Sequence, residues 1–191
     1  MRHDELHLTD PRALHALAHP VRMAIIDLLQ EREVATATDC AAIVDESVQS
    51  CAYHLRTLAK LGLVEEVPGT DGRERPWRLR FAGFSVPKQQ TASPQFKAAW
   101  AALRGRIVER DLDLLRRFVE DEDEFRPEQH QASTIRNMTL HGTPEELQAL
   151  ADEVSALLAR YRRQRKAERP EGAERVHAVF WLIPRRDPGG R

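Results

Sequence analysis

Side chains that could bind nucleic acid gather in one short segment of this 191-residue sequence, between Ser47 and Gly62. With about 100° of rotation per residue, the segment projects as an amphipathic helix. Its apolar side holds Val48, Cys51, Ala52, Leu55, Leu58 and Ala59, and its polar side holds Gln49, Ser50, Tyr53, His54, Arg56, Thr57 and Lys60. Amide, hydroxyl and guanidinium groups bind base edges and phosphates. No carboxylate lies in the segment to repel phosphate, so the pattern favours a DNA-binding helix; an ordinary solvated helix is the alternative.

Two further basic residues, Arg73 and Arg75, follow in a glycine-containing turn. The turn separates two predicted strands, Leu63 to Val67 and Trp77 to Phe81. In the second strand apolar residues alternate with arginine, which is the period of a half-buried strand. We therefore expect a β-hairpin whose basic turn extends the polar surface.

Helical periodicity and capping residues predict four helices before this hairpin. The helix starts are Asp10-Pro11, Pro20, Thr38 or Asp39, and Ser47, and the fourth helix ends at Gly62. Only residues 44–47 join the third helix to the fourth. Two short helices across such a turn form a helix-turn-helix, whose second helix can enter the major groove of DNA.

Charge is distributed unevenly along the chain, although the formal net charge is only -1. Residues 1–46 hold four basic and nine acidic side chains, a balance of -5, whereas residues 47–86 hold six basic and four acidic, a balance of +2. A local positive face can steer DNA without a basic overall composition. No apolar run approaches the ~20 residues of a membrane span, and no signal peptide is visible. With two cysteines and an arginine-rich composition, we expect a bacterial, cytoplasmic and nucleoid-associated protein.

The second half predicts a different organisation. After a linker at 87–94, part of a Gly- and Pro-containing stretch that starts at residue 83, one long amphipathic helix covers 95–120. A strand at 134–140, a helix from Thr143 to about Lys166 and a strand at 176–183 follow. The expected fold is mainly α: a winged helix-turn-helix domain at 1–86, then a dimerisation helix and a small α+β region within 95–191. An effector pocket in that region is a hypothesis, with lining residues Ile135, Met138, Phe180 and Trp181.

Three motifs in residues 10–86 resemble the ArsR-type winged helix-turn-helix regulators. Leu14 to Arg22 is similar to their first-helix motif, Tyr53 to Val64 to their recognition helix and its exit, and Asp71 to Trp77 occupies the wing. The resemblance implies a homodimeric transcriptional regulator that binds an inverted-repeat operator in double-stranded DNA, and we expect it to act as a repressor. The residues it implies at the DNA are Ser47, Gln49, Ser50, Tyr53, His54 and Arg56, with Arg73 and Arg75 on phosphate or in the minor groove.

The chain departs from the family pattern at two places. Asp45 stands where the turn usually has Gly, but Asp tolerates the left-handed conformation better than most residues. Metal-sensing members carry Cys-x-Cys where this chain has Thr36-Ala37-Thr38. The resemblance therefore supports DNA binding and argues against an inherited metal site, so we expect no cofactor.

Other residue clusters leave alternatives open. Cys40 and Cys51 favour buried packing over a redox switch, because no basic residue accompanies them on their helix faces. Histidine pairs near the N-terminus, such as His15 and His19, have metal-ligand spacing but fit structural roles better. No catalytic motif appears, so we expect no enzyme. A winged helix that binds protein instead of DNA, and a small-molecule enzyme or carrier in the second half, are the competing functions.

Overall fold

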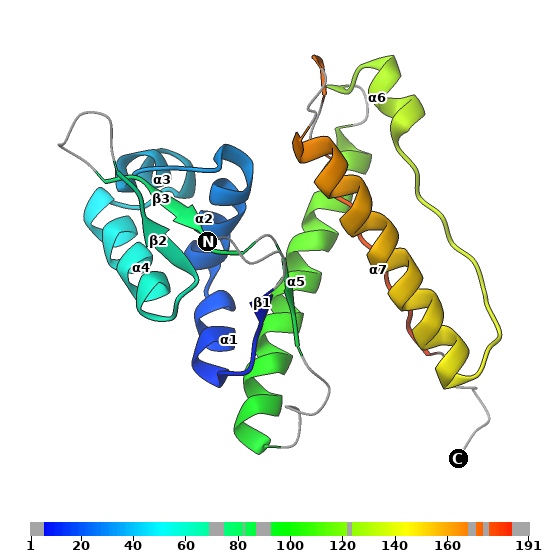
Figure 1. The fold of residues 1–191 in the computed structure, drawn as a ribbon. Helices are drawn as coiled ribbons and strands as arrows, with labels where there is room; N and C mark the ends of the chain where they lie inside the picture. Colours follow the sequence, from blue (N-terminus) through cyan, green and yellow to red (C-terminus); the bar gives the residue numbers. More distant parts are fainter. Residues whose placement is uncertain are drawn as a thin grey trace. The chain divides into compact units, whose positions relative to one another are not determined.

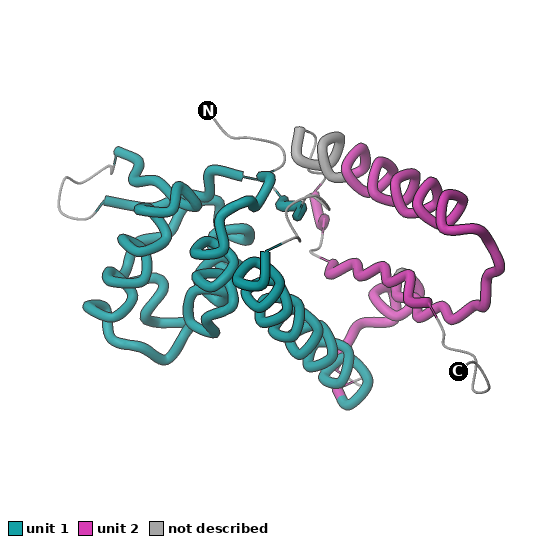
Figure 2. Tube along the Cα trace, turned by 90° about the horizontal axis from the view of Figure 1, so that it is seen from below, with its two compact units in different colours: residues 1–120 teal, residues 121–191 magenta. Residues whose placement is uncertain are grey.

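In the computed structural model, the described residues are 6–68, 75–81, 83–86, 93–121, 124–167, 171–173 and 176–184. The chain divides into two compact units, residues 1–120 and residues 121–191, drawn in different colours in Figure 2. Helices dominate both units (Figure 1), which confirms the mainly helical class. No helix in the described part of the chain is long and apolar enough to cross a bilayer.

The first unit begins with the four helices expected from the sequence. They are α1 (Pro11–Leu17), α2 (Pro20–Arg32), α3 (Ala37–Val44) and α4 (Val48–Lys60). The predicted caps are confirmed at two of them: a carboxylate oxygen of Asp10 accepts from the backbone N–H of Arg12 at 2.9 Å, and the Ser47 hydroxyl accepts from the N–H of Ser50 at 3.1 Å.

The cap of α3 differs from the prediction. Thr36, rather than Thr38 or Asp39, is the N-cap, and Asp39 completes a reciprocal capping box. The Asp39 N–H donates to the Thr36 hydroxyl at 3.1 Å, and the Thr36 N–H donates to the Asp39 carboxylate at 2.8 Å. Asp39 therefore acts from the first turn, where its charge also suits the helix dipole.

The predicted hairpin is present. Strand β2 (Val64–Glu66) pairs antiparallel with β3 (Trp77–Leu79), with Glu65 opposite Arg78. Trp77 and Leu79 are buried, whereas Arg78 lies on the half-exposed side, as the alternation indicated. The turn residues 69–74, including Arg73, lie outside the described residues.

A second, parallel strand pair was not expected. Strand β1 (Leu6–His7) pairs with β4 (Phe84–Ser85), and the Leu6 N–H donates to the carbonyl of Gly83 at 2.8 Å. The interpretation of residues 83–86 as the start of a linker stretch is therefore wrong. Pairing between positions 78 residues apart leaves no local signal in two-residue strands.

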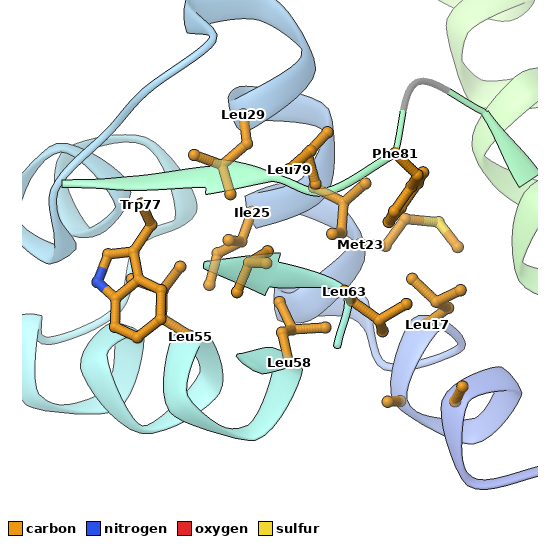
Figure 3. Close-up of a cluster of buried hydrophobic side chains, with 14 of the residues drawn as sticks. Leu17, Met23, Ile25, Leu29, Leu55, Leu58, Leu63, Trp77, Leu79 and Phe81 are labelled. Atoms are coloured by element: carbon orange, nitrogen blue, oxygen red, sulfur yellow. The ribbon is translucent and has the colours of Figure 1, made fainter. Parts of the chain in front are cut away.

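One apolar core holds α4 against the other elements of this unit. Figure 3 shows side chains from α1, α2, α4 and the hairpin meeting in a single cluster. The labelled members are Leu17, Met23, Ile25, Leu29, Leu55, Leu58, Leu63, Trp77, Leu79 and Phe81. Because these positions come from far apart in the sequence, the core fixes the direction in which the other face of α4 points.

The long helix α5 (Pro94–Glu120) confirms the long helix predicted over 95–120 in length and position. Its first half buries Phe96, Ala99 and Leu103, and α1 lies along it (Figure 1). The Ser93 hydroxyl accepts from the Phe96 N–H at 3.1 Å, so the helix begins one residue earlier than predicted. Helix α5 thus belongs to the same compact unit as the helix-turn-helix.

The second unit contains α6 (Pro127–Ala132), which the sequence did not indicate, and α7 (Pro144–Ala167). The predicted start of α7 is confirmed, because the Thr143 N–H donates to the Glu146 carboxylate at 2.8 Å. The strands expected at 134–140 and 176–183 are absent from the described residues of this unit.

The side chains of the hypothetical effector pocket are accordingly exposed. They are Ile135, Met138, Phe180 and Trp181. A strand needs a hydrogen-bonded neighbour to become stable, and apolar residues alone do not supply one. The predictions of a strand–helix–strand arrangement and of a pocket between its elements are therefore wrong for the described residues of this unit.

Candidate nucleic-acid interface

The outer face of α4 carries one continuous polar stripe. Gln49, Tyr53, Arg56 and Lys60 recur at helical spacing and are all exposed, while Cys51, Leu55 and Leu58 on the opposite side are buried. Tyr53 is 60% exposed and lies one helical turn after Gln49 and one turn before Arg56. The stripe can donate to and accept from base edges, and it carries two positive charges without a carboxylate.

The turn before α4 exposes the start of the helix. Asp45 adopts the left-handed conformation, with φ 50° and ψ 45°, and Ser47 caps the first turn. Ser47 is exposed and Ser50 is half-buried. Val48, which the helical projection assigned to the core, is instead 44% exposed. The projection fails there because none of the described elements covers the first turn of the helix on that side.

His54 does not belong to this exposed face. Its side chain is only 8% exposed, and its ring lies 4.8 Å from the ring of His19, centroid to centroid. Burial lowers the pKa of both imidazoles, and the nearby guanidinium of Arg22 lowers each pKa further. The predicted donation from His54 to DNA does not fit this burial, because the ring packs against His19 inside the domain.

Thr57 is also turned partly away from solvent. Its hydroxyl donates to the backbone carbonyl of Tyr53 at 2.9 Å, one turn earlier on the same helix. This bond leaves the Thr57 hydroxyl at the edge of the stripe formed by Gln49, Tyr53, Arg56 and Lys60.

Ion pairs hold the described cations of the hairpin. The Arg75 guanidinium lies 3.1 Å from the Glu66 carboxylate, and Arg78 lies 2.7 Å from Glu65. The hydrogen bond from Arg78 holds the pKa of the Glu65 carboxyl below its usual range. Arg75 is largely exposed, so its pairing with Glu66 is a weak surface interaction that a phosphate could replace.

Arg22 is a residue of this domain to which the sequence pattern assigned no role. Its Nε donates to the carbonyl of Ala16 at 2.6 Å, and Nη2 donates to the carbonyl of His15 at 3.4 Å. It thereby binds the end of α1 from the first turn of α2. Basic side chains commonly satisfy the free carbonyls at a helix end, and the His-Pro-x-Arg spacing is the local signal that could have indicated it.

Both cysteines are fully buried, as predicted. Burial raises the pKa of the Cys40 thiol to about 12, and it also raises the pKa of the Cys51 thiol. Neither thiol is thereby activated as a nucleophile or redox sensor. Among the described residues, no three His, Cys, Asp or Glu side chains are grouped as metal ligands.

Residues 17–67 match a family model described as a helix-turn-helix domain. The matched range contains α2, α3, α4 and β2. With the hairpin after α4, this part of the chain is a winged helix-turn-helix. No curated protein sequence matches the chain.

Several solved structures of regulators are similar to the chain. A transcriptional regulator homologue from Pyrococcus horikoshii is 22% identical, over 51% of this chain and 89% of the other, with a TM-score of 0.33. A protein described as a possible transcriptional regulator for arsenical resistance is 30% identical, over 57% of this chain and 94% of the other, with a TM-score of 0.33. NadR, solved in complex with 4-hydroxyphenylacetate, is 18% identical, over 78% of this chain and 81% of the other, with a TM-score of 0.35.

Proposed function

We propose that this winged helix-turn-helix regulator is a homodimeric, cytoplasmic repressor that binds an inverted repeat in double-stranded DNA. The observation that carries the proposal is the exposed stripe of α4. Four polar or cationic side chains lie on it, and the apolar core behind it fixes its direction. A solvated surface helix has no need for such a carboxylate-free face, whereas a helix facing phosphates does.

The side chains divide into two roles. Gln49, Ser50, Tyr53 and Arg56 lie within the first nine residues of α4 and would contact base edges in the major groove. Ser47, Thr57 and Lys60 lie at the ends or edge of the stripe and would contact phosphate. Arg75, together with Arg73, would bind phosphate or the minor groove from the hairpin.

The second half of α5 supports the dimer. Four large apolar side chains there, at i, i+4, i+7 and i+11, are 40–56% exposed: Val108, Leu112, Leu115 and Val119. This spacing makes one seam along a helix, which a second helix can cover. A two-fold dimer would place two copies of α4 about one turn of DNA apart, ~34 Å, and so match an inverted repeat.

A mobility-shift assay tests the proposal. The full-length protein is mixed with DNA from upstream of its own coding sequence and with a shuffled duplex of equal composition, at two salt concentrations. We expect preference for the upstream DNA, with affinity that falls as salt rises. Equal binding to both duplexes at moderate salt would refute sequence-specific regulation, and no binding to either would favour a protein-binding winged helix.

A further inference from the structure

Val48 brings an aliphatic side chain to the DNA-facing end of α4. It is the first residue of the helix and is 44% exposed; Tyr53 is the other large hydrophobic residue exposed on α4. The neighbours of Val48 in sequence are the capping residue Ser47 and the amide residue Gln49. The isopropyl group can neither donate nor accept a hydrogen bond, so its contribution at this surface must be an apolar contact.

The major groove offers such a side chain one apolar partner. Each base pair presents donors and acceptors there, and thymine adds its C5-methyl group. Residues at the start of a recognition helix contact base edges. We propose that Val48 packs against the C5-methyl of a thymine in each half-site and is thus a specificity-determining residue. This inference rests on the proposed function.

Exposure alone does not distinguish Val48, because single exposed apolar residues are common on proteins. Ile43 on α3 is 53% exposed and lies in the same helix-turn-helix. The first helix of such a motif crosses the DNA backbone, whereas the second enters the groove. Val48 lies on the helix that would enter the groove, next to Gln49 in sequence, whereas Ile43 does not. Ile43 therefore serves as the matched control.

The experiment first selects the preferred duplex from a random library with the full-length protein. Each thymine of that duplex is then replaced singly by deoxyuridine, which keeps the pairing edge and removes only the methyl. Loss of one buried methyl corresponds to about four-fold in Kd. We expect one thymine per half-site to show this loss with the wild-type protein and with Val48→Ile.

The variant Val48→Ala tests whether Val48 is the residue that contacts the thymine methyl. It should bind the thymine and deoxyuridine duplexes equally, while Ile43→Ala keeps the wild-type difference. Because both side chains are exposed, neither change removes core packing, and urea unfolding checks that both variants fold. If no deoxyuridine position matters, or if Val48→Ala stays as sensitive as the wild type, the inference is wrong while the proposed function stands. Failure to select any sequence would overturn both.

Discussion

The imidazole of His54 on α4 lies against that of His19, the residue that precedes α2, with ring centroids 4.8 Å apart and ring planes tilted by 43°. The Nδ1 atoms of both rings are buried and have no hydrogen-bond partner in the part of the chain that the structure describes. Burial disfavours a positive charge on His19 most strongly, and Arg22, His54 and Arg106 add to this effect, whereas Glu46 opposes it. The two imidazole rings therefore join the start of α2 to α4, and their environment disfavours the protonated form of His19.

This pair should make stability depend on pH in the mildly acidic range. Burial, followed by Arg22, lowers the pKa of both histidines below the 6.5 of an unfolded chain. Below pH 6.5 the unfolded state binds more protons than the folded state, so the free energy of unfolding falls as pH falls. The carboxyls with lowered pKa values, such as those of Asp39 and Glu65, titrate at lower pH and act outside this window.

Urea unfolding at pH 7.5 and pH 5.5 measures the effect. The free energy of unfolding of the wild type should fall from pH 7.5 to pH 5.5. That of His54→Leu should fall by less, whatever its value at pH 7.5. His130, which lies in the second unit, provides the control His130→Leu, which should keep the wild-type difference. An unchanged pH difference in His54→Leu would show that other groups cause it.

Gln49→Ala should change which sequence is preferred. A bidentate amide contact to a base edge discriminates by about 1–3 kcal/mol against the wrong base. Selection from a random duplex library should therefore return a motif relaxed at one position per half-site. The salt dependence of binding should stay the same, since Gln49 carries no charge, and a changed salt slope with an unchanged motif would contradict this role.

For the hairpin, where Arg75 pairs with Glu66, we expect the reverse of the Gln49 result: a change in salt dependence without a change in sequence preference. Arg75→Ala should weaken binding to all sequences alike and reduce the slope of log K against log salt by about 1. Arg73→Ala should behave in the same way. Glu66→Gln should strengthen binding, because it frees Arg75 and removes a negative charge. Arg12 on α1 pairs with the capping residue Asp10, and Arg12→Ala is the control. An equal loss of DNA affinity in Arg12→Ala would mean that the assay responds to the overall charge of the protein and not to the hairpin.

Asp45 should show how strictly the turn depends on its left-handed backbone. With φ 50°, this position costs roughly 1–2 kcal/mol for most residues but less for Asp. Asp45→Ala should therefore lower the free energy of unfolding by about 1 kcal/mol, and Asp45→Gly should not lower it. Chemical denaturation of both variants compares them directly, and an equal loss in the two would locate the effect in the Asp side chain instead.

Local signals explain why most of the first unit could be predicted. Capping residues such as Asp10 and Ser47, and the arginine alternation in β3, act within a few residues of themselves. These signals were enough for α1, α2, α4 and the hairpin. The cap of α3 was predicted at Thr38 or Asp39, whereas Thr36 is the N-cap because its side chain and that of Asp39 form a reciprocal capping box.

Long-range contacts explain the differences. Helical projection placed His54 among the polar residues, but α2 brings His19 over it. It placed Val48 in the core, but the elements that the structure describes leave this side chain 44% exposed. The expected strands of the second unit had the right apolar content, yet pairing requires a neighbour that their own sequence does not specify.

The apolar seam of α5 should hold the dimer together. Leu112 lies in the middle of the seam, so Leu112→Glu would place a charge where the second copy is expected and should shift the protein towards monomer. Sedimentation equilibrium measures this shift, and DNA binding should weaken because one half-site is lost. Leu114 is 39% exposed on another face of the same helix, so Leu114→Glu is the matched control. If Leu114→Glu dissociates the dimer as readily as Leu112→Glu, or if neither does, the seam formed by Val108, Leu112, Leu115 and Val119 is not the dimer interface.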